Sequence, residues 1–186
     1  MTTSLPEPAD PPAWAVEAVH LSGYDPRWPE RAAGYADEVR PVLAPWLLGP
    51  IEHVGSTSVP GLVAKPVIDL MAQVADTDAA VGALAELDWR YVPPELDGQP
   101  WRRFFVKVSP DGLHRLAHLH VMPAGAARWD QQLRFRDALR ASPALLDEYA
   151  AVKSRLASTY ADDRERYTDE KAAFVTRVMR DLGAAR

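Results

Sequence analysis

The chain has 186 residues, of which 47% are apolar, and a formal net charge of −5, so it is long enough for one domain with its own core and has no overall positive field for nucleic acid. It has no cysteine, which excludes disulfides and thiolate metal sites. Its apolar stretches are too short to cross a membrane and its N-terminus lacks the pattern of a signal peptide, so we expect a cytoplasmic protein with no membrane partner.

The first half of the chain is expected to alternate strands and helices after a disordered tail. Residues 1–13 are rich in proline, serine and threonine, which is typical of disorder, and residues 14–186 are expected to form a single domain. Pro29 favours the first turn of a helix, while Pro41 and Pro45 leave the end of that helix open. The elements expected up to residue 92 are a strand at 15–21, a helix from 29 to about 42, strands at 51–54 and 66–74, a helix capped by Thr77 or Asp78 and ending near 87, and a strand at 89–92.

The second half is expected to form a hairpin and then three helices. Residues 109–112 read Ser-Pro-Asp-Gly, a turn sequence that joins two strands into an antiparallel hairpin. Ser142 and Pro143 suit an N-cap and a first helical position, and Thr168 is the expected cap of the last helix. The elements expected here are a polar loop at 93–100, strands at 103–108 and 115–122, and helices at 127–139, 143–160 and 168–182. The fold class is therefore α+β (mixed α/β), a mixed sheet flanked by helices with a helical C-terminal cap.

The loop of Gly55, Ser56, Thr57 and Ser58 follows a short apolar strand and is the first candidate site. A glycine lets an anion approach the backbone, and hydroxyls and a following helical turn add hydrogen-bond donors, so the loop suits a phosphate. The pattern is neither a Walker A motif nor a Rossmann fingerprint. The alternative is a hydroxyl-rich turn that only caps a short helix.

Asp69 is the one carboxylate inside the apolar strand expected at 66–74. A buried carboxylate is costly unless it is paired or binds a metal. Asp69 and Met71 share one face of a strand, and two-metal phosphoryl-transfer enzymes carry a second acid at the position that Met71 takes here. The alternative is a structural aspartate that is paired with Lys65 or an arginine.

His118 and His120 form a His-x-His pair in a predicted strand, so both side chains are expected on the same face. Neutral imidazoles bind zinc, manganese or nickel. Together with Asp69 they are the candidate ligands of a divalent cation, either magnesium, manganese or zinc. The alternative is a pair of half-exposed strand histidines without a metal.

Four cationic residues are candidates for neutralising phosphate charge. Arg102 and Arg103 precede two phenylalanines, and arginine suits bidentate phosphate binding. Lys65 follows the candidate loop, and Lys171 lies in the first turn of the last expected helix. The alternative for each of them is a solvated surface charge.

The segments EHVGSTSVPGL, KPVIDL, RRFF, HLHV, FRDALR and YTDEKAAFV together resemble the GrpB-like proteins (UPF0157), a bacterial family, over residues 24–182. The resemblance implies the nucleotidyltransferase superfamily and its DNA polymerase β-like fold, in which Gly-Ser precedes a strand with Asp-x-Asp or Asp-x-Glu. Gly55, Ser56 and Asp69 match that signature. Met71 departs from it, and histidines stand on the later strand that would carry a third aspartate. Some relatives are fused to dephospho-CoA kinase, which implies a link to coenzyme A biosynthesis.

Three functional hypotheses follow. The first is a nucleotidyltransferase that binds a nucleotide or other phosphorylated ligand at the loop and transfers a nucleotidyl group to an unknown acceptor, with Asp69 as its catalytic residue. The second is a non-catalytic module of the same fold that binds a nucleotide or phosphate ligand. The third is a metal-dependent hydrolase or lyase that uses Asp69 with His118 and His120. Whether the protein is an enzyme is left open, and no nucleic-acid partner is expected.

Overall fold

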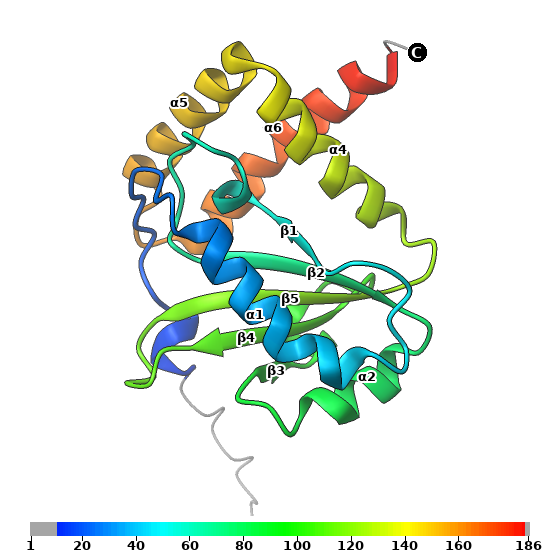
Figure 1. Ribbon diagram of the computed structural model, residues 1–186. Helices are drawn as coiled ribbons and strands as arrows, with labels where there is room; N and C mark the ends of the chain where they lie inside the picture. The colour runs from blue at the N-terminus through cyan, green and yellow to red at the C-terminus, as the bar shows by residue number, and fades with distance from the viewer. Residues whose placement is uncertain (1–10, 185–186) are drawn as a thin grey trace, which may run out of the picture.

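The computed structural model describes residues 11–184, which fold around a mixed five-stranded sheet (Figure 1). The strand order is β1-β2-β5-β4-β3. β2 and β5 run parallel at the centre, and the other neighbours are antiparallel. The strands are β1 (Glu52–Val54), β2 (Ile68–Val74), β3 (Arg90–Val92), β4 (Arg103–Val108) and β5 (Arg115–Pro123).

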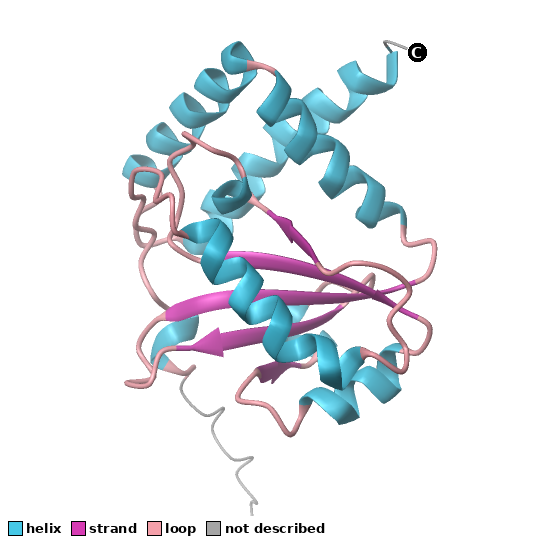
Figure 2. Cartoon of the chain, viewed as in Figure 1, coloured by secondary structure: helices cyan, strands magenta, loops and turns pink. Residues whose placement is uncertain are grey.

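Helices surround this sheet in the described part of the chain (Figure 2). The α-helices are α1 (Trp28–Leu43), α2 (Thr77–Leu84), α3 (Pro94–Asp97), α4 (Ala127–Ala141), α5 (Pro143–Thr159) and α6 (Arg164–Ala184). The 3-10 helices are η1 (Ala13–Ala15) and η2 (Ser56–Ser58). The expected α+β class, with its flanking helices and helical C-terminal cap, is confirmed.

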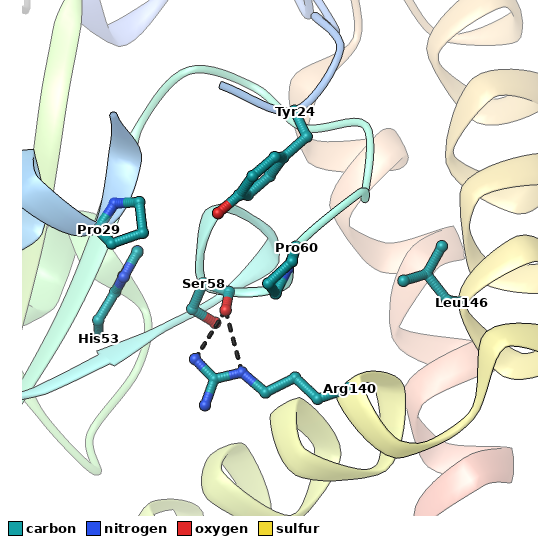
Figure 3. Close-up of a pocket in the computed structure, with 7 residues that line it drawn as sticks. All are labelled: Tyr24, Pro29, His53, Ser58, Pro60, Arg140 and Leu146. Carbon is teal, nitrogen blue, oxygen red and sulfur yellow. Dashed lines mark hydrogen bonds between the residues drawn. The ribbon is translucent and has the colours of Figure 1, made fainter. Parts of the chain in front are cut away.

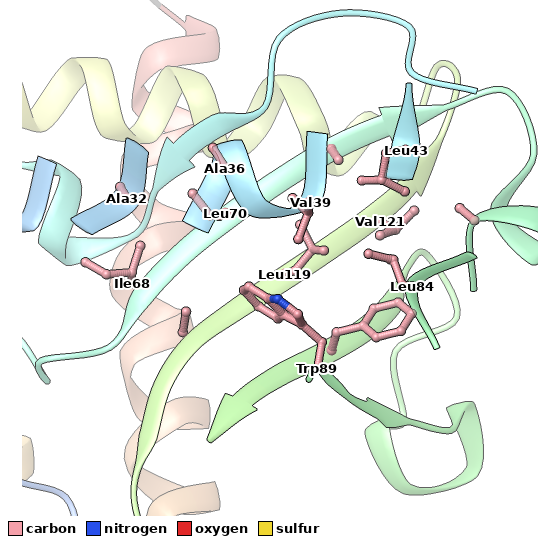
Figure 4. Close-up of a cluster of buried hydrophobic side chains, with 14 of the residues drawn as sticks. Ala32, Ala36, Val39, Leu43, Ile68, Leu70, Leu84, Trp89, Leu119 and Val121 are labelled. Atoms are coloured by element: carbon pink, nitrogen blue, oxygen red, sulfur yellow. The ribbon is translucent and has the colours of Figure 1, made fainter. Parts of the chain in front are cut away.

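One face of the sheet is covered by α1 and α2 and forms the main core (Figure 4). Alternation along the two central strands sends Ile68 and Leu70 of β2, and Leu119 and Val121 of β5, to this face. All four are at most 1% exposed. The apolar stripe of α1, which includes the fully buried Val39, packs on them. The opposite face of these strands is thereby left for the polar residues of β2 and β5.

The three C-terminal helices pack against one another and against the segment that follows η2 (Figure 1). Val59 and Leu62 of this segment are fully buried among them. Phe135, Tyr149 and Phe174, one from each helix, form an aromatic cluster with ring centroids 4.9–6.5 Å apart. The helical cap therefore rests on the same loop that carries the candidate phosphate site.

The predicted hairpin and the predicted start of α5 are confirmed. β4 and β5 pair antiparallel, and the Gly112 N–H donates to the Ser109 carbonyl at 2.8 Å to close the turn between them. The Ser142 side chain accepts a hydrogen bond from the Leu145 N–H at 3.3 Å, and Pro143 is the first residue of α5. Local turn and cap chemistry was therefore sufficient to place these elements.

The end of α1 agrees with the helix predicted to about residue 42, whereas the cap of α2 differs from the prediction. α1 continues through Pro41 to its last residue, Leu43, because Leu43 is fully buried against the sheet and its packing offsets the lost hydrogen bond. The cap of α2 is Asp76 and not Thr77 or Asp78. The Asp76 carboxylate accepts hydrogen bonds from the N–H groups of Asp78 and Ala79 at 3.0 and 2.9 Å.

Two helical segments begin where none was predicted. α6 starts four residues before Thr168, because the Asp163 carboxylate accepts a hydrogen bond from the Arg166 N–H at 2.9 Å and caps the helix there. Residues 93–100, predicted as a loop, contain the one-turn helix α3.

The strand predicted at residues 15–21 is wrong. Its alternation is real, but no strand lies beside it in the described chain. Instead the Val19 N–H donates to the Ala161 carbonyl at 2.9 Å, and Ser22 forms an isolated bridge with Ala64. Alternation without a neighbouring strand therefore gave a segment that lies outside the sheet and begins with the last residue of η1.

Residues 1–10 of the predicted tail 1–13 lie outside the described residues, and Ala13 opens η1. Within residues 11–184 no helix combines the length and apolar character that a membrane span requires.

We expect Leu119→Ala to lower the free energy of unfolding by about 2–5 kcal/mol, because Leu119 is fully buried on a central strand and its loss leaves a cavity. Leu113→Ala is the control, since Leu113 is 50% exposed, and its cost should stay below about 0.5 kcal/mol. Urea denaturation of both variants measures the two values. Equal costs would contradict this assignment of the core.

Candidate functional site

The parallel pairing of β2 and β5 brings Asp69 and two histidines together. His118 is the Cα partner of Asp69 in the neighbouring strand, and alternation places His120 on the same face. Asp69 Oδ1 lies 2.8 Å from His118 Nδ1 and 3.6 Å from His120 Nε2. Each residue offers one metal-ligand atom, and these atoms lie within 4.8 Å of one another. The structure therefore brings together the three residues that were predicted as metal ligands.

Asp69 is ionised and His118 is neutral in this arrangement. Burial would raise the pKa of Asp69, but hydrogen bonds from His118 and His120 outweigh it and hold this pKa well below its usual range. Burial lowers the pKa of His118 to about 4, against the opposing effect of Asp69. An ionised carboxylate only accepts hydrogen bonds, so the His118 proton is on Nδ1 and a lone pair is on Nε2. That Nε2 is buried and has no hydrogen-bond partner in the described part of the chain.

Arg102 lies beside the site and orients His120. Its guanidinium contacts His120 Nδ1, and because a guanidinium only donates, the His120 proton is on Nε2, toward Asp69. Asp97 holds the same guanidinium with two hydrogen bonds of 2.6 and 2.9 Å, and the centre of the Phe104 ring lies 4.0 Å from its central carbon. The charge of Arg102 is therefore already balanced by Asp97.

Arg103 is not brought into the site. It shares its face of β4 with Phe105, which belongs to the core under α1 and α2. Its guanidinium donates to the Asp78 carboxylate of α2 at 3.0 and 3.2 Å. The sheet thus separates Arg103 from the candidate loop, and its predicted role in binding phosphate is not supported by this placement.

Gly55 lies directly against Asp69. Its φ is 69°, a conformation that favours glycine, and a Cβ at this position would lie 2.2 Å from Asp69 Oδ2. Any side chain here would strain the backbone and displace the carboxylate. The Gly-Ser loop and Asp69 are therefore two parts of one site.

All three loop hydroxyls have partners within the protein, and that of Ser56 is the Tyr149 side chain. Thr57 and Ser58 are 1% and 4% exposed. The Thr57 hydroxyl donates to the Val67 carbonyl at 3.4 Å, and the Ser58 hydroxyl donates to the Gly55 carbonyl at 2.6 Å. Neither hydroxyl is placed to serve as the predicted phosphate ligand. The N–H groups of Ser56 and Thr57, however, make no backbone hydrogen bond within residues 11–184 and are the donors that the loop offers.

Three lysines gather beside the loop. Lys153 of α5 is 2% exposed and donates to the Val63 carbonyl. Burial lowers the pKa of Lys153 well below its ordinary value, and the charges of Lys171 and Lys65 lower it further. The Nζ atoms of Lys65 and Lys171 lie 4.6 and 5.6 Å from the centre of the Tyr167 ring. An anion with several charges would relieve the repulsion among these lysines.

Sequence reasoning missed Lys153 and assigned Tyr149 only to the core. Lys153 lies four residues after Tyr149 and three before Leu156, so it falls on the apolar stripe that the sequence predicts for this helix. A lysine in the middle of an apolar stripe could have indicated from the sequence that Lys153 is buried at a site. Burial raises the pKa of Tyr149, and a hydrogen bond with the Ser56 side chain opposes this, which places Tyr149 next to the candidate loop.

Met71 takes the position of the second acid and is fully buried. It packs with Val54 and Met122, and Trp129 of α4 lies against this cluster. The departure from the superfamily signature at this position is therefore a packed apolar contact that brings no charge to the site.

A pocket of about 330 Å3 adjoins the loop on the α1 side of β1 (Figure 3). His53, which was not a candidate, points into it, with its Nε2 3.0 Å from Thr57 Oγ1. Burial lowers the pKa of His53 to about 4. Arg140 donates two hydrogen bonds to the Ser58 carbonyl at 2.7 and 3.1 Å. Ser58 belongs to the loop and also lines the pocket. The lining residues are Tyr24, Pro29, His53, Ser58, Pro60, Arg140 and Leu146.

We expect Gly55→Ala to destabilise the protein more than Gly61→Ala. Both glycines have a positive φ, of 69° and 82°, but only Gly55 has a carboxylate in the path of its Cβ. Backbone strain costs roughly 1–3 kcal/mol in either variant, and the clash with Asp69 adds to it only in Gly55→Ala. Chemical denaturation measures the difference, which Asp69→Ala in the Gly55→Ala background should remove. Equal costs for the two glycines would show that the loop does not press on Asp69.

We expect the free energy of unfolding to fall as the pH drops from about 6.5 toward 4. In this range the histidines become protonated in the unfolded chain, while the buried histidines of the folded protein stay neutral. The pKa of His53 is lowered to about 4 and that of His118 likewise, so their contributions are complete above the unfolded value and are lost on acidification. Urea denaturation at several pH values measures the slope. His53→Gln should reduce it by about 1.4 kcal/mol per pH unit. His20→Gln, at an exposed histidine, is the control, and an unchanged slope in His53→Gln would contradict the assignment.

Comparison with known proteins places the chain in a family. A family model described as GrpB protein matches residues 18–181. A UPF0157 protein of Pseudomonas aeruginosa is 43% identical over 167 residues, which are 87% of this chain and 67% of that protein. A UPF0157 protein of Halalkalibacterium halodurans is 36% identical over 167 residues, which are 90% of this chain and 84% of that protein.

Solved structures agree on the fold. The conserved protein GrpB from Enterococcus faecalis superposes with a TM-score of 0.72 and 26% identity, over 86% of this chain and 99% of that one. The Cid1 poly(U) polymerase with MgGTP bound superposes with a TM-score of 0.50 and 10% identity, over 73% of this chain and 44% of that one, a likeness of fold alone. The chain therefore belongs to the GrpB (UPF0157) family, and its architecture is nucleotidyltransferase-like.

Proposed function

We propose that this protein is a nucleotidyltransferase that uses a nucleoside triphosphate and a divalent cation. The proposal is carried by the contact between the Gly55 backbone and the Asp69 carboxylate. A phosphate held by the N–H groups of Ser56 and Thr57 would lie beside this carboxylate, and two anions remain together only with a cation between them. The nucleotidyltransferase-like fold supports this, since the Cid1 polymerase of similar fold is described with MgGTP bound.

The three lysines would supply positive charge to the β- and γ-phosphates. Lys65 and Lys171 lie close enough to Lys153 for their charges to lower its pKa. A bound polyphosphate would reverse this effect, because a nearby anion favours the protonated form of a lysine. Arg102 would act indirectly through His120, since Asp97 already neutralises its charge. Phosphate recognition is therefore assigned to the loop and the lysines.

The residues present fit a divalent cation. Asp69 offers a charged oxygen, and His118 and His120 each offer one nitrogen within 4.8 Å of it. His118 now donates to Asp69 through Nδ1, so it would bind a cation beside Asp69 only after the Nδ1 proton is lost or moves to Nε2. His120 would join them only after Arg102 leaves its Nδ1, because its proton is now on Nε2. A carboxylate with one or two imidazoles favours manganese or zinc over magnesium, which prefers oxygen ligands. Such a cation, when bound, would neutralise charge on the transferred phosphate.

The groups of this chain would position the triphosphate for attack by an acceptor hydroxyl. The acceptor oxygen forms a bond to the α-phosphorus, and the bond from that phosphorus to the oxygen bridging to the β-phosphate breaks. Pyrophosphate leaves with the electron pair, and the acceptor proton passes to water. The lysines would stabilise the charge that develops on the leaving group, and such preorganised charge is the main source of catalysis in phosphoryl transfer.

Met71 favours a second candidate, a module that binds a nucleotide without transferring it. Its fully buried thioether cannot hold the second cation that two-metal transfer requires. A metal-dependent hydrolase that uses Asp69, His118 and His120 stays a third prediction. In that case water would attack the nucleoside triphosphate in place of the acceptor, and the products would be the nucleoside monophosphate and pyrophosphate. Product analysis with and without added acceptors separates the three functions.

We also propose a cytoplasmic location and a small-molecule nucleotide ligand, with no nucleic-acid or membrane partner. The net charge of −5 supports the exclusion of nucleic acid. The link to coenzyme A biosynthesis rests on the fused relatives implied by the family resemblance.

We expect Asp69→Asn to weaken binding of ATP in the presence of manganese by about tenfold or more, because the amide keeps the shape of the carboxylate but loses the charge that holds the cation. The same variant should release no pyrophosphate with any acceptor that the unmodified protein uses. Isothermal titration calorimetry and a pyrophosphate assay measure the two effects.

Asp78→Asn is the matched control, since Asp78 lies on α2 across the sheet and its side chain is 81% exposed. It should bind ATP and manganese like the unmodified protein. Metal-dependent ATP binding that survives intact in Asp69→Asn would refute the proposed site. ATP binding without pyrophosphate release in the unmodified protein would favour the binding module.

A further inference from the structure

Two buried side-chain nitrogens within residues 11–184 have no hydrogen-bond partner. One is His118 Nε2, which belongs to the site described above. The other is Arg128 Nε, which lies outside it. Leaving a buried N–H unpaired is costly, so such a group in a native protein calls for a partner that is not part of the chain.

Arg128 lies in the first turn of α4 beside the indole of Trp101. Its central guanidinium carbon is 5.6 Å from the centre of the Trp101 ring, and that of Arg102 is 4.9 Å from the same ring. Arg102 has the carboxylate of Asp97 as its counter-ion. Among the described residues no carboxylate forms an ion pair with Arg128, whose one side-chain hydrogen bond is a long contact of 3.4 Å to Gln131 Oε1. Two guanidiniums therefore share one indole, and only one of them is balanced.

This arginine–indole platform, formed by Arg128 and Trp101, lies on the opposite side of Asp69 from the lysines. Trp101 stacks on His120 with ring centroids 6.0 Å apart and an interplanar angle of 13°, and it packs on the cluster that contains Met71. Along β2 the chain passes from Lys65, just before the strand, to Asp69 and then to Met71. Asp69 is thus flanked by lysines at one end and by the platform at the other.

We infer that the arginine–indole platform binds the acceptor substrate, and that this acceptor carries a carboxylate or phosphate group. The inference rests on the proposed nucleotidyl transfer. In that reaction the attacking and leaving oxygens are roughly in line through the α-phosphorus. The acceptor must therefore approach from the side opposite the pyrophosphate, and because the lysines mark the pyrophosphate side, the platform is on the acceptor side.

The chemistry of the platform selects an anion. A guanidinium matches a carboxylate or phosphate with two parallel N–H···O bonds, and the unpaired Nε of Arg128 is one of the donors on that edge. The indole face holds the guanidinium by a cation–π contact and fixes its plane. The acceptor is therefore a small molecule with an anionic group besides the oxygen that attacks.

The test uses the full chain labelled with 15N, with inorganic phosphate and acetate as separate probes. The Arg128 Nε–H resonance, assigned by its loss in Arg128→Lys, should shift saturably with at least one of the two anions. In Arg128→Gln the affinity, followed on the indole N–H of Trp101, should fall by about tenfold or more. Arg40→Gln makes the same charge change on α1, across the sheet, and should bind the anion like the unmodified protein.

A response to phosphate only, to acetate only or to both supports the inference and tells which group the acceptor carries. No response of Arg128 to either anion overturns it, and this result needs no variant to fold. A second titration in the presence of saturating ATP and manganese tests the acceptor role, since acceptor and nucleotide must be bound together. Loss of the anion by competition would assign Arg128 to the nucleotide and overturn the acceptor role. If ATP does not bind at all, the proposed function fails and the acceptor role fails with it.

Discussion

The hydrogen bond between Asp69 and His118, across the parallel pair β2 and β5, is the contact on which the rest of the site depends. A carboxylate on a central strand is costly unless it is paired, and the His118 Nδ1–H at 2.8 Å provides that pairing. The same carboxylate leaves room only for glycine at position 55. Because the backbone at Gly55 must pass so close to Asp69, the loop that follows presents its N–H groups at the edge of the carboxylate.

The sequence predicts relations within a strand well and relations between strands poorly. Alternation correctly puts Asp69 with Met71 and His118 with His120 on common faces. It does not say which strands are neighbours or in what register, because pairing is decided by the whole buried face of the sheet. The meeting of Asp69 with the histidines therefore had to come from the structure. The segment at 15–21 alternates, yet no strand within residues 11–184 pairs with it.

For Arg102 and Arg103, alternation along the strand could have corrected the prediction from the sequence alone. Adjacent residues of an extended segment point to opposite faces, so both arginines were never able to reach one phosphate. The structure sends Arg102 to His120 and Arg103 to Asp78. Lys153 is a different case, because it comes from the helical cap. Only the packing of α5 against the loop reveals that its stripe position faces the site.

This chain lacks the second and third carboxylates of the nucleotidyltransferase signature. Their loss changes the number of cations that the site can bind more than it changes the net charge offered to the triphosphate. Two divalent cations on three carboxylates leave one net positive charge for a triphosphate, and one divalent cation on the single carboxylate of Asp69 leaves the same charge. Neutral imidazoles at His118 and His120 preserve this balance, because they bind a cation without adding negative charge. An acid at position 71 would upset it unless a second cation came with it. The buried Met71 is therefore consistent with a one-cation site, in which the lysines carry the remaining charge of the phosphates.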